Sequence, residues 1–235
     1  MGRVFEKRKY KMFARYDKMA KTFTRIGREI AISVKQNGPD PGNNPRLRMA
    51  IQNAKANNMP KDRVDAAIKR ASSKDEKNFE EIMYEGYGPY GVGILLECAT
   101  DNPTRTVANV RMYFSRGGGE LGKTGSLDFM FERKGVFKIP SKNINVEEFE
   151  LEMIDFGAEE IEAGEDGIYI YTSFTDFGKM QKALEVKGIE ILNAEKIRIP
   201  TTTVELNEDQ QQEINVLVEK MEEDDDIQTV YSNMK

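Results

Sequence analysis

The chain has 235 residues, of which 32% are charged, one is a cysteine, and none is a histidine or a tryptophan. Without histidine, a Ser-His-Asp triad, a Cys-His dyad and the usual zinc sites are excluded, and a single cysteine excludes a disulfide framework. No run of about 18 apolar residues occurs, so a membrane span is not expected. The length is sufficient for two or three small domains.

Charge is distributed unevenly along the chain, although the net charge is only −5. Residues 1–77 hold 20 Lys and Arg against 8 Asp and Glu, a net +12, whereas residues 78–235 hold 15 against 32, a net −17. A basic segment of this kind predicts contact with nucleic acid, because cations bind phosphates and release counterions. Aromatic residues interleaved with the first cations, such as Phe5, Tyr10 and Phe13, can stack on bases. The alternative is the solvated face of a surface helix.

Three amphipathic helices are predicted before residue 72, and the first is expected to begin at Asp17. Asn44-Pro45 begins the second helix and Met59-Pro60 the third. Their apolar stripes should pack together as a small bundle. The stripes consist of Phe23, Ile26, Ile30, Val34, Leu47, Ala50, Ile51, Ala54, Val64, Ala67, Ile68 and Ala71.

The candidate nucleic-acid-binding residues are the cations of this basic segment, in two groups. The N-terminal group is Lys7, Arg8, Lys9, Lys11, Arg15, Lys18, Lys21, Arg25 and Arg28. The second group, expected on the outward faces of the next two helices, is Arg46, Arg48, Lys61, Arg63, Lys69 and Arg70.

Beyond residue 78 the apolar pattern shifts toward the period of two that is typical of strands. Strands are predicted at 81–85 and 92–99, followed by a helix from Asn102-Pro103 to Gly117-Gly118. The alternation of Leu127, Phe129 and Phe131 predicts a further strand. Residues 135–199 follow the order strand, helix, strand, strand, helix, strand of a ferredoxin-like unit, with Phe149, Met153 and Ile154 directed inward from its first helix. A helix at 207–221 and a strand at 227–231 complete the chain.

These elements predict an α+β fold of three domains. The first is a basic helical domain, residues 1–77. The second is a discontinuous α+β domain, residues 78–133 and 201–235, because the last helix and strand have no core of their own. The third is a ferredoxin-like domain, residues 134–200, inserted into the second.

One string matches a nucleotide-binding motif. Residues Gly117 to Thr124 fit the P-loop pattern, but a P-loop follows a buried strand and opens a helix, whereas here a helix comes before and an alternating strand after. A glycine turn is therefore the preferred interpretation, with nucleotide hydrolysis as a distant alternative.

The carboxylates also show no pairing that indicates catalysis. The acidic run from Glu222 to Asp226 matches no calcium loop, and such runs are usually solvated. No pair of groups stands out as acid and base, so no enzyme activity, metal or cofactor is expected.

Several motifs resemble those of the YebC/PmpR family. They are Phe23-Thr24-Arg25-Ile26-Gly27-Arg28-Glu29-Ile30, Asn44-Pro45-Arg46-Leu47-Arg48, Ala56-Asn57-Asn58-Met59-Pro60-Lys61-Asp62, Ile68-Lys69-Arg70, Tyr84-Glu85-Gly86-Tyr87-Gly88-Pro89, Glu97-Cys98-Ala99-Thr100-Asp101-Asn102, Arg105-Thr106-Val107 and Gly125-Ser126-Leu127. The resemblance begins near Thr22 and continues to the acidic terminus. Many family members begin Ala-Gly-His-Ser-Lys-Trp, whereas this chain has Gly2-Arg3-Val4-Phe5-Glu6-Lys7, so a contact of that His or Trp is not carried over.

The resemblance implies a cytoplasmic three-domain α+β protein. Family members are described as DNA-binding transcriptional regulators, with a mitochondrial branch of translational activators and other members tied to relief of stalled ribosomes. We therefore expect a non-enzymatic nucleic-acid-binding regulator of gene expression. The alternative is an RNA-associated translation factor on the ribosome, and the acidic domains are expected to face away from the nucleic acid or toward a protein partner.

Overall fold

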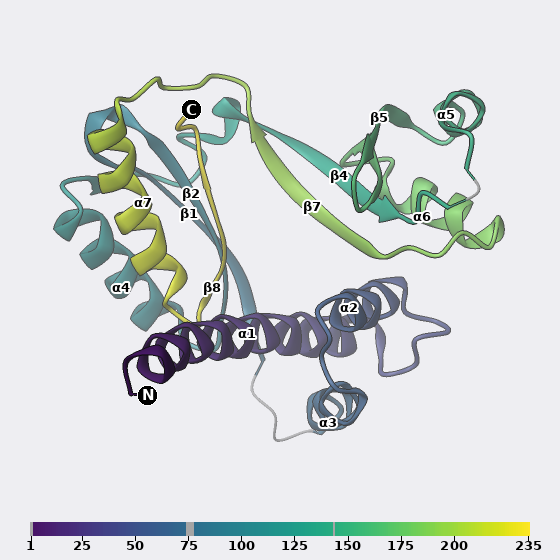
Figure 1. The fold of residues 1–235 in the computed structure, drawn as a ribbon, viewed down its shortest axis with the longest axis horizontal. Helices are drawn as coiled ribbons and strands as arrows, with labels where there is room; N and C mark the ends of the chain where they lie inside the picture. The colour runs from purple at the N-terminus through teal and green to yellow at the C-terminus, as the bar shows by residue number, and fades with distance from the viewer. Residues whose placement is uncertain (1, 74–77, 143) are drawn as a thin grey trace. The chain divides into compact units, whose positions relative to one another are not determined.

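The computed structural model describes the backbone of residues 2–73, 78–142 and 144–235 and, within these ranges, the side chains from residue 19 onward. These residues form seven α-helices, eight strands and two short 3-10 helices, which confirms the α+β class (Figure 1). Their contacts divide the chain into two compact units. The first unit comprises Met1–Met83, Glu97–Tyr113 and Val216–Val230, and the second comprises Tyr84–Leu96, Phe114–Asn215 and Tyr231–Lys235. The three-domain division remains a prediction.

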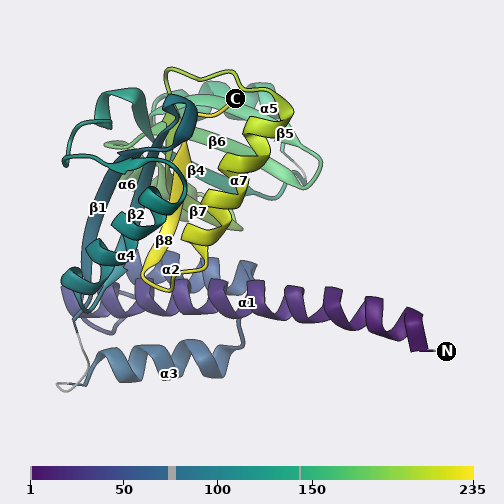
Figure 2. The same cartoon turned by 90° about the vertical axis from the view of Figure 1, so that its left-hand side faces the viewer.

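In the first unit, helices α1 (Gly2–Asn37), α2 (Pro45–Ala56) and α3 (Lys61–Ala71) form the predicted bundle. Figure 2 shows α3 lying along α1. Apolar side chains from all three helices make one buried core, which consists of Ile30, Ala31, Val34, Leu47, Ala50, Ala54, Val64, Ala67 and Ala71. The predicted stripes therefore face one another.

Local signals explain where these helices end. Helix α1 ends before Gly38, which has the left-handed φ of +83°. A residue without Cβ takes this conformation most easily, and helices commonly end at such a glycine. The side chain of Asn44 accepts a hydrogen bond from the backbone N–H of Leu47 and caps α2. The predicted start of α1 at Asp17 is wrong, since the helix begins at Gly2. Residues 3–26 contain neither glycine nor proline, so nothing in them stops a helix.

A four-stranded sheet has the order β3-β1-β2-β8. Its strands are β1 (Glu80–Tyr87), β2 (Gly93–Thr100), β3 (Glu120–Leu121) and β8 (Ile227–Ser232). The 3-10 helix η1 (Pro89–Gly91) connects β1 to β2. In the chain, helix α4 (Pro103–Arg116) follows β2, and helix α7 (Glu208–Glu222) precedes β8.

The second sheet lies entirely in the second unit and has the order β5-β6-β4-β7, with every neighbouring pair antiparallel. Its strands are β4 (Phe131–Ile139), β5 (Ala158–Gly164), β6 (Gly167–Ser173) and β7 (Asn193–Pro200), and its helices are α5 (Val146–Ile154) and α6 (Phe177–Val186). This order of strands and helices confirms the ferredoxin-like prediction. Buried side chains such as Phe137, Ile170 and Met180 form its core.

Two details of the second unit differ from prediction. Leu127, Phe129 and Phe131 do not share a strand, because Asp128–Met130 forms the 3-10 helix η2 and only then does β4 begin. Phe129 is 77% exposed as a result. Ile154, predicted to face inward, is 54% exposed at the last turn of α5. In the described part of the chain, no helix has the length and apolar character needed to cross a membrane.

Candidate nucleic-acid interface

Four of the candidate cations are exposed on α3. They are Lys61, Arg63, Lys69 and Arg70, at positions other than the buried Val64, Ala67 and Ala71. The guanidinium of Arg63 lies over the ring of Phe23 of α1, with its central carbon 5.6 Å from the ring centroid. This contact orients Arg63 while its N–H groups remain available to an anion. Helix α3 thus exposes four cations, together with the two acidic residues Asp62 and Asp65.

Arg46 of α2 is committed to contacts within the protein. Its Nε and Nη2 donate to the two carboxylate oxygens of Glu29 at 2.7 and 3.0 Å, and Nη2 also donates to Glu81 at 2.6 Å. Burial alone would lower the pKa of Arg46, but its hydrogen bonds to Glu81 and Glu29 outweigh the effect of burial and raise the pKa above its ordinary value. Arg46 therefore links α2 to α1 and β1.

Arg48 is also held locally, because its Nη1 donates to the backbone carbonyls of Pro41 and Gly42 at 2.7 and 3.0 Å. These bonds fix the loop that precedes α2. Lys21 is half-buried on α1. The backbone of Lys7, Arg8, Lys9, Lys11, Arg15 and Lys18 lies in α1, and their side chains lie outside the described part.

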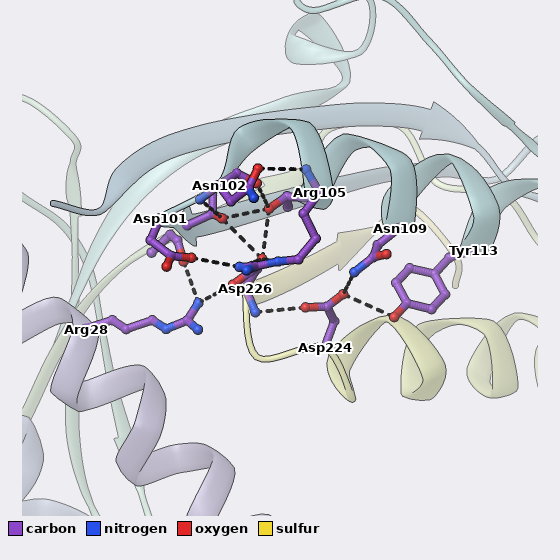
Figure 3. Close-up of polar contacts among 11 residues, drawn as sticks. Arg28, Asp101, Asn102, Arg105, Asn109, Tyr113, Asp224 and Asp226 are labelled. Carbon is purple, nitrogen blue, oxygen red and sulfur yellow. Dashed lines mark hydrogen bonds and ion pairs between the residues drawn. The ribbon is translucent and has the colours of Figure 1, made fainter. Parts of the chain in front are cut away.

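Arg25 and Arg28 of α1 contact the acidic turn between α7 and β8. Arg25 Nη2 donates to the carbonyl of Glu222 at 2.9 Å. Arg28 Nη1 donates to Asp226 Oδ1 at 2.9 Å and to the carbonyl of Ala99 at 2.5 Å (Figure 3). The side chain of Arg28 is only 14% exposed. In this arrangement neither arginine offers a free guanidinium to a phosphate.

Asp226 is the centre of a polar cluster, although the acidic run was predicted to be solvated. The residue is 2% exposed, so the prediction is wrong for Asp226. Its Oδ2 accepts hydrogen bonds from Arg105 Nη2 at 2.7 Å and Nε at 3.2 Å, from Thr106 at 2.9 Å and from Thr100 at 3.1 Å (Figure 3). Burial would raise the pKa of Asp226, but the bonds from Arg105, Thr106 and Arg28 prevail and hold it below its ordinary value.

A second carboxylate fixes the same turn to α4. Asp224 Oδ2 accepts hydrogen bonds from Asn109 at 2.9 Å and from Tyr113 at 3.1 Å, and its Oδ1 accepts the backbone N–H of Asp226 at 2.9 Å. Residues 222–226, α4 and α1 are thereby joined by side chains far apart in the sequence. No short-range pattern predicts this cluster. The only local sign is the polar run Thr100-Asp101-Asn102, which lies between an apolar strand and an amphipathic helix.

The P-loop match at Gly117 to Thr124 has a different geometry from a phosphate-binding loop. It follows α4, with Gly118 at φ +75°, and it contains strand β3. No helix begins at Thr124. Instead, Glu85, which is 3% exposed, accepts the backbone N–H groups of Gly125 at 2.7 Å and Leu127 at 2.6 Å. Within the match, the backbone N–H groups of Gly119 and Gly122 donate to the carbonyls of Phe114 and Glu85 at 2.8 and 2.7 Å, which agrees with the predicted glycine turn.

Neither metal ligands nor a reactive thiol are evident among the described side chains. No group of three or more His, Cys, Asp or Glu residues in that part of the chain is placed to hold a metal ion. Burial, with the nearby carboxylates of Asp224 and Asp226, raises the pKa of the Cys98 thiol to about 12. Cys98 is therefore protonated at neutral pH and poorly nucleophilic.

The fold and these contacts define a class of α+β protein with a basic three-helix bundle and two four-stranded sheets. The model of the TACO1/YebC protein N-terminal domain matches residues 3–74, and the model of the TACO1/YebC second and third domain matches residues 79–234. The chain belongs to the TACO1/YebC family.

Relatives match this chain over its whole length. A "Probable transcriptional regulatory protein" of Cytophaga hutchinsonii is 60% identical, covering 100% of this chain and 98% of the relative. A protein of the same name from Parabacteroides distasonis is 52% identical, covering 100% and 97%. The crystal structure of a conserved hypothetical protein from Aquifex aeolicus, 38% identical, superposes with a TM-score of 0.78 over 92% of this chain and 90% of that one. The chain is thus related throughout to proteins named as transcriptional regulators.

Proposed function

We propose that this protein is a non-enzymatic, nucleic-acid-binding regulator of gene expression that acts in the cytoplasm and contacts phosphates through its basic helical bundle. The observation that carries the proposal is the exposure of four cations on α3. The net charge of +12 in residues 1–77 supports it, because an exposed basic surface attracts polyanions over several ångströms. The names of the relatives support a regulatory role.

The exposed residues of α3 suit contact with phosphates and include no amide side chain that would read adenine. Its exposed residues are Lys61, Asp62, Arg63, Asp65, Ala66, Lys69 and Arg70, with no Asn or Gln among them. Asn and Gln pair with adenine edges, and phosphate contacts position a protein without reading sequence. This observation keeps a second candidate function open, that of an RNA-associated translation factor, because structured RNA is recognised largely by shape and backbone.

The experiment that tests the proposal compares two double variants of equal charge. Arg63 and Arg70 are seven residues apart, which is two helical turns, so they leave the same side of α3. Replacing both by Gln should weaken binding to a 20-base-pair DNA duplex and to a structured RNA, measured by fluorescence anisotropy, and should reduce the salt slope of log Kd by roughly one per lost phosphate contact.

The matched control replaces Lys179 and Lys182 by Gln. These lysines are exposed on α6, in the acidic part of the chain, and their loss changes the net charge equally. Equal weakening in both double variants would show that only overall charge matters, which would contradict an interface on α3. A preference for the duplex or for the RNA separates the two candidate functions.

A further inference from the structure

We propose that the acidic turn from Glu222 to Asp226 is an autoinhibitory latch, which withholds Arg25 and Arg28 of α1 from nucleic acid until a polyanion competes for them. The inference rests on the proposed function, because it concerns the availability of two candidate phosphate-binding arginines. It assigns a regulatory role to the acidic part of the chain.

The turn presents oxygen acceptors to two arginines of α1. Arg25 and Arg28 are three residues apart and lie on the same side of α1. The first donates to the carbonyl of Glu222 at the C-terminal end of α7, where the helix dipole is negative, and the second to the Asp226 carboxylate. Both guanidinium groups are therefore already bound to anionic or partly negative acceptors.

The latch is built to open without leaving a buried charge unpaired. Breaking a buried ion pair is normally unfavourable, because one charge stays behind without a partner. When Arg28 leaves, however, Asp226 retains the two bonds from Arg105 and the hydroxyls of Thr100 and Thr106. The side chain of Arg105 is 45% exposed, so it can remain in place while α1 moves.

The released arginine in turn finds a favourable partner. A guanidinium binds phosphate oxygens with two parallel hydrogen bonds, which replace those to Asp226 and to the carbonyl of Ala99. The bundle core formed by residues such as Ile30, Val34, Leu47 and Val64 takes no part in the exchange. The helical bundle can therefore stay folded while its arginines change partners.

The test uses the full-length protein and two isoelectric variants. Asp226→Asn removes the charge that holds Arg28, whereas Asp225→Asn removes the same charge from the exposed neighbour in the same turn. Affinity is measured by anisotropy with the 20-base-pair duplex and the structured RNA at one salt concentration. Hydrogen exchange of peptides that cover residues 20–37 and 222–230 reports opening.

Asp226→Asn is expected to increase exchange in both peptides and to tighten binding roughly tenfold, the gain that follows if a tenth of the wild-type molecules are open. Asp225→Asn should stay within about twofold of the wild type on the same reasoning. Equal affinities for the two variants would overturn the latch. The thiol of Cys98, 3% exposed in β2, should remain unreactive toward iodoacetamide in both variants, which shows that the sheet is intact.

A measurement on the wild type alone covers the case in which Asp226→Asn fails to fold. Saturating nucleic acid should increase hydrogen exchange in the 222–230 peptide, because Arg25 and Arg28 leave it. Binding without that increase would overturn the latch while the proposed function stands. Absence of binding by the wild type and by Asp226→Asn, to either probe, would overturn both.

Discussion

Single polar side chains hold several backbone groups at the chain reversals of this protein. Asn44 is fully buried, and its side chain caps α2 while its Nδ2 donates to the carbonyls of Ser33 and Gly38 at 2.8 and 2.9 Å. One amide therefore satisfies three backbone groups and fixes the end of α1 to the start of α2. The start of α2 at Asn44-Pro45 was predicted from the sequence, but the hydrogen bonds of the Asn44 side chain could not be.

Replacing Asn44 by Ala should lower the free energy of unfolding by about 2–3 kcal/mol, because a helix cap is lost and one buried and one part-buried carbonyl lose a donor. Urea unfolding followed by circular dichroism measures this. Asn43→Ala is the control, since the exposed Asn43 bonds only to the neighbouring Asp40 at the surface among described residues, and it should cost under about 1 kcal/mol. Similar losses for both would contradict the structural role of Asn44.

The lowered pKa of Asp226 implies that the stability of the protein depends on pH. The folded-state pKa of Asp226 is lowered below the ordinary 3.8, so its contribution is complete above the unfolded pKa and is lost as the pH falls through the folded pKa. At pH 7 the free energy of unfolding of the wild type should exceed that of Asp226→Asn by about 3 kcal/mol. This difference should shrink as the pH falls below 3.8.

Urea unfolding of the two proteins between pH 3 and pH 7 is the measurement for Asp226. Asp225→Asn, at the exposed neighbour, should show a much smaller difference from the wild type at every pH. A difference between wild type and Asp226→Asn that stays constant down to pH 3 would contradict the ion pairs of the cluster.

At the scale of elements, most helices and strands could be predicted because their signals are local. The stripe from Ile26 to Val34 has helical spacing, and the order of elements at 135–199 specifies a ferredoxin-like sheet. The strand predicted at Leu127 to Phe131 was wrong because Glu85, about 40 residues earlier, binds the backbone of Gly125 and Leu127 and bends it into a turn. Alternation of apolar residues carries no information about such a distant carboxylate.

Replacing two glycines by Ala should have opposite effects on stability, because one has open space around it and the other is tightly packed. Gly178 lies in α6 with no atom within 4 Å of an added Cβ, so Gly178→Ala should stabilise the protein by about 0.5–1 kcal/mol. Gly86 lies in β1, where a Cβ would meet the Glu120 carbonyl at 2.5 Å and the Phe114 ring at 2.7 Å, so Gly86→Ala should destabilise it by about 1–3 kcal/mol. The midpoint of thermal unfolding, Tm, is measured for the two variants and the wild type. Shifts of Tm with the same sign in both variants would contradict the packing around Gly86.

At the scale of the whole molecule, the uneven charge predicts that binding is dominated by phosphate contacts. If the basic segment makes about 6–10 such contacts, affinity should fall roughly 10³–10⁵-fold between 50 and 200 mM salt. Anisotropy titrations across that range measure the slope, with sucrose in place of salt as the control for nonionic effects. An affinity independent of salt would contradict the electrostatic interface.

The candidate site was only partly predictable, and the arginines show why. The sequence marked Arg28 and Arg63 equally as candidate phosphate contacts, because both belong to the same basic segment. In the structure Arg63 is exposed on α3, while Arg28 is paired with a carboxylate 198 residues away. Two side chains of the same type thus acquire different roles through packing alone.

The sequence by itself determined the α+β class, the helical bundle, the ferredoxin-like order of elements and the separation of basic from acidic segments. These properties follow from the spacing of apolar residues, from caps and from charge, all of which act within a few residues. Only the tertiary structure decided which cations are free and which are held, and that Asp226 is buried rather than solvated. Such partners are far apart in the chain, and their distance depends on how every intervening element folds.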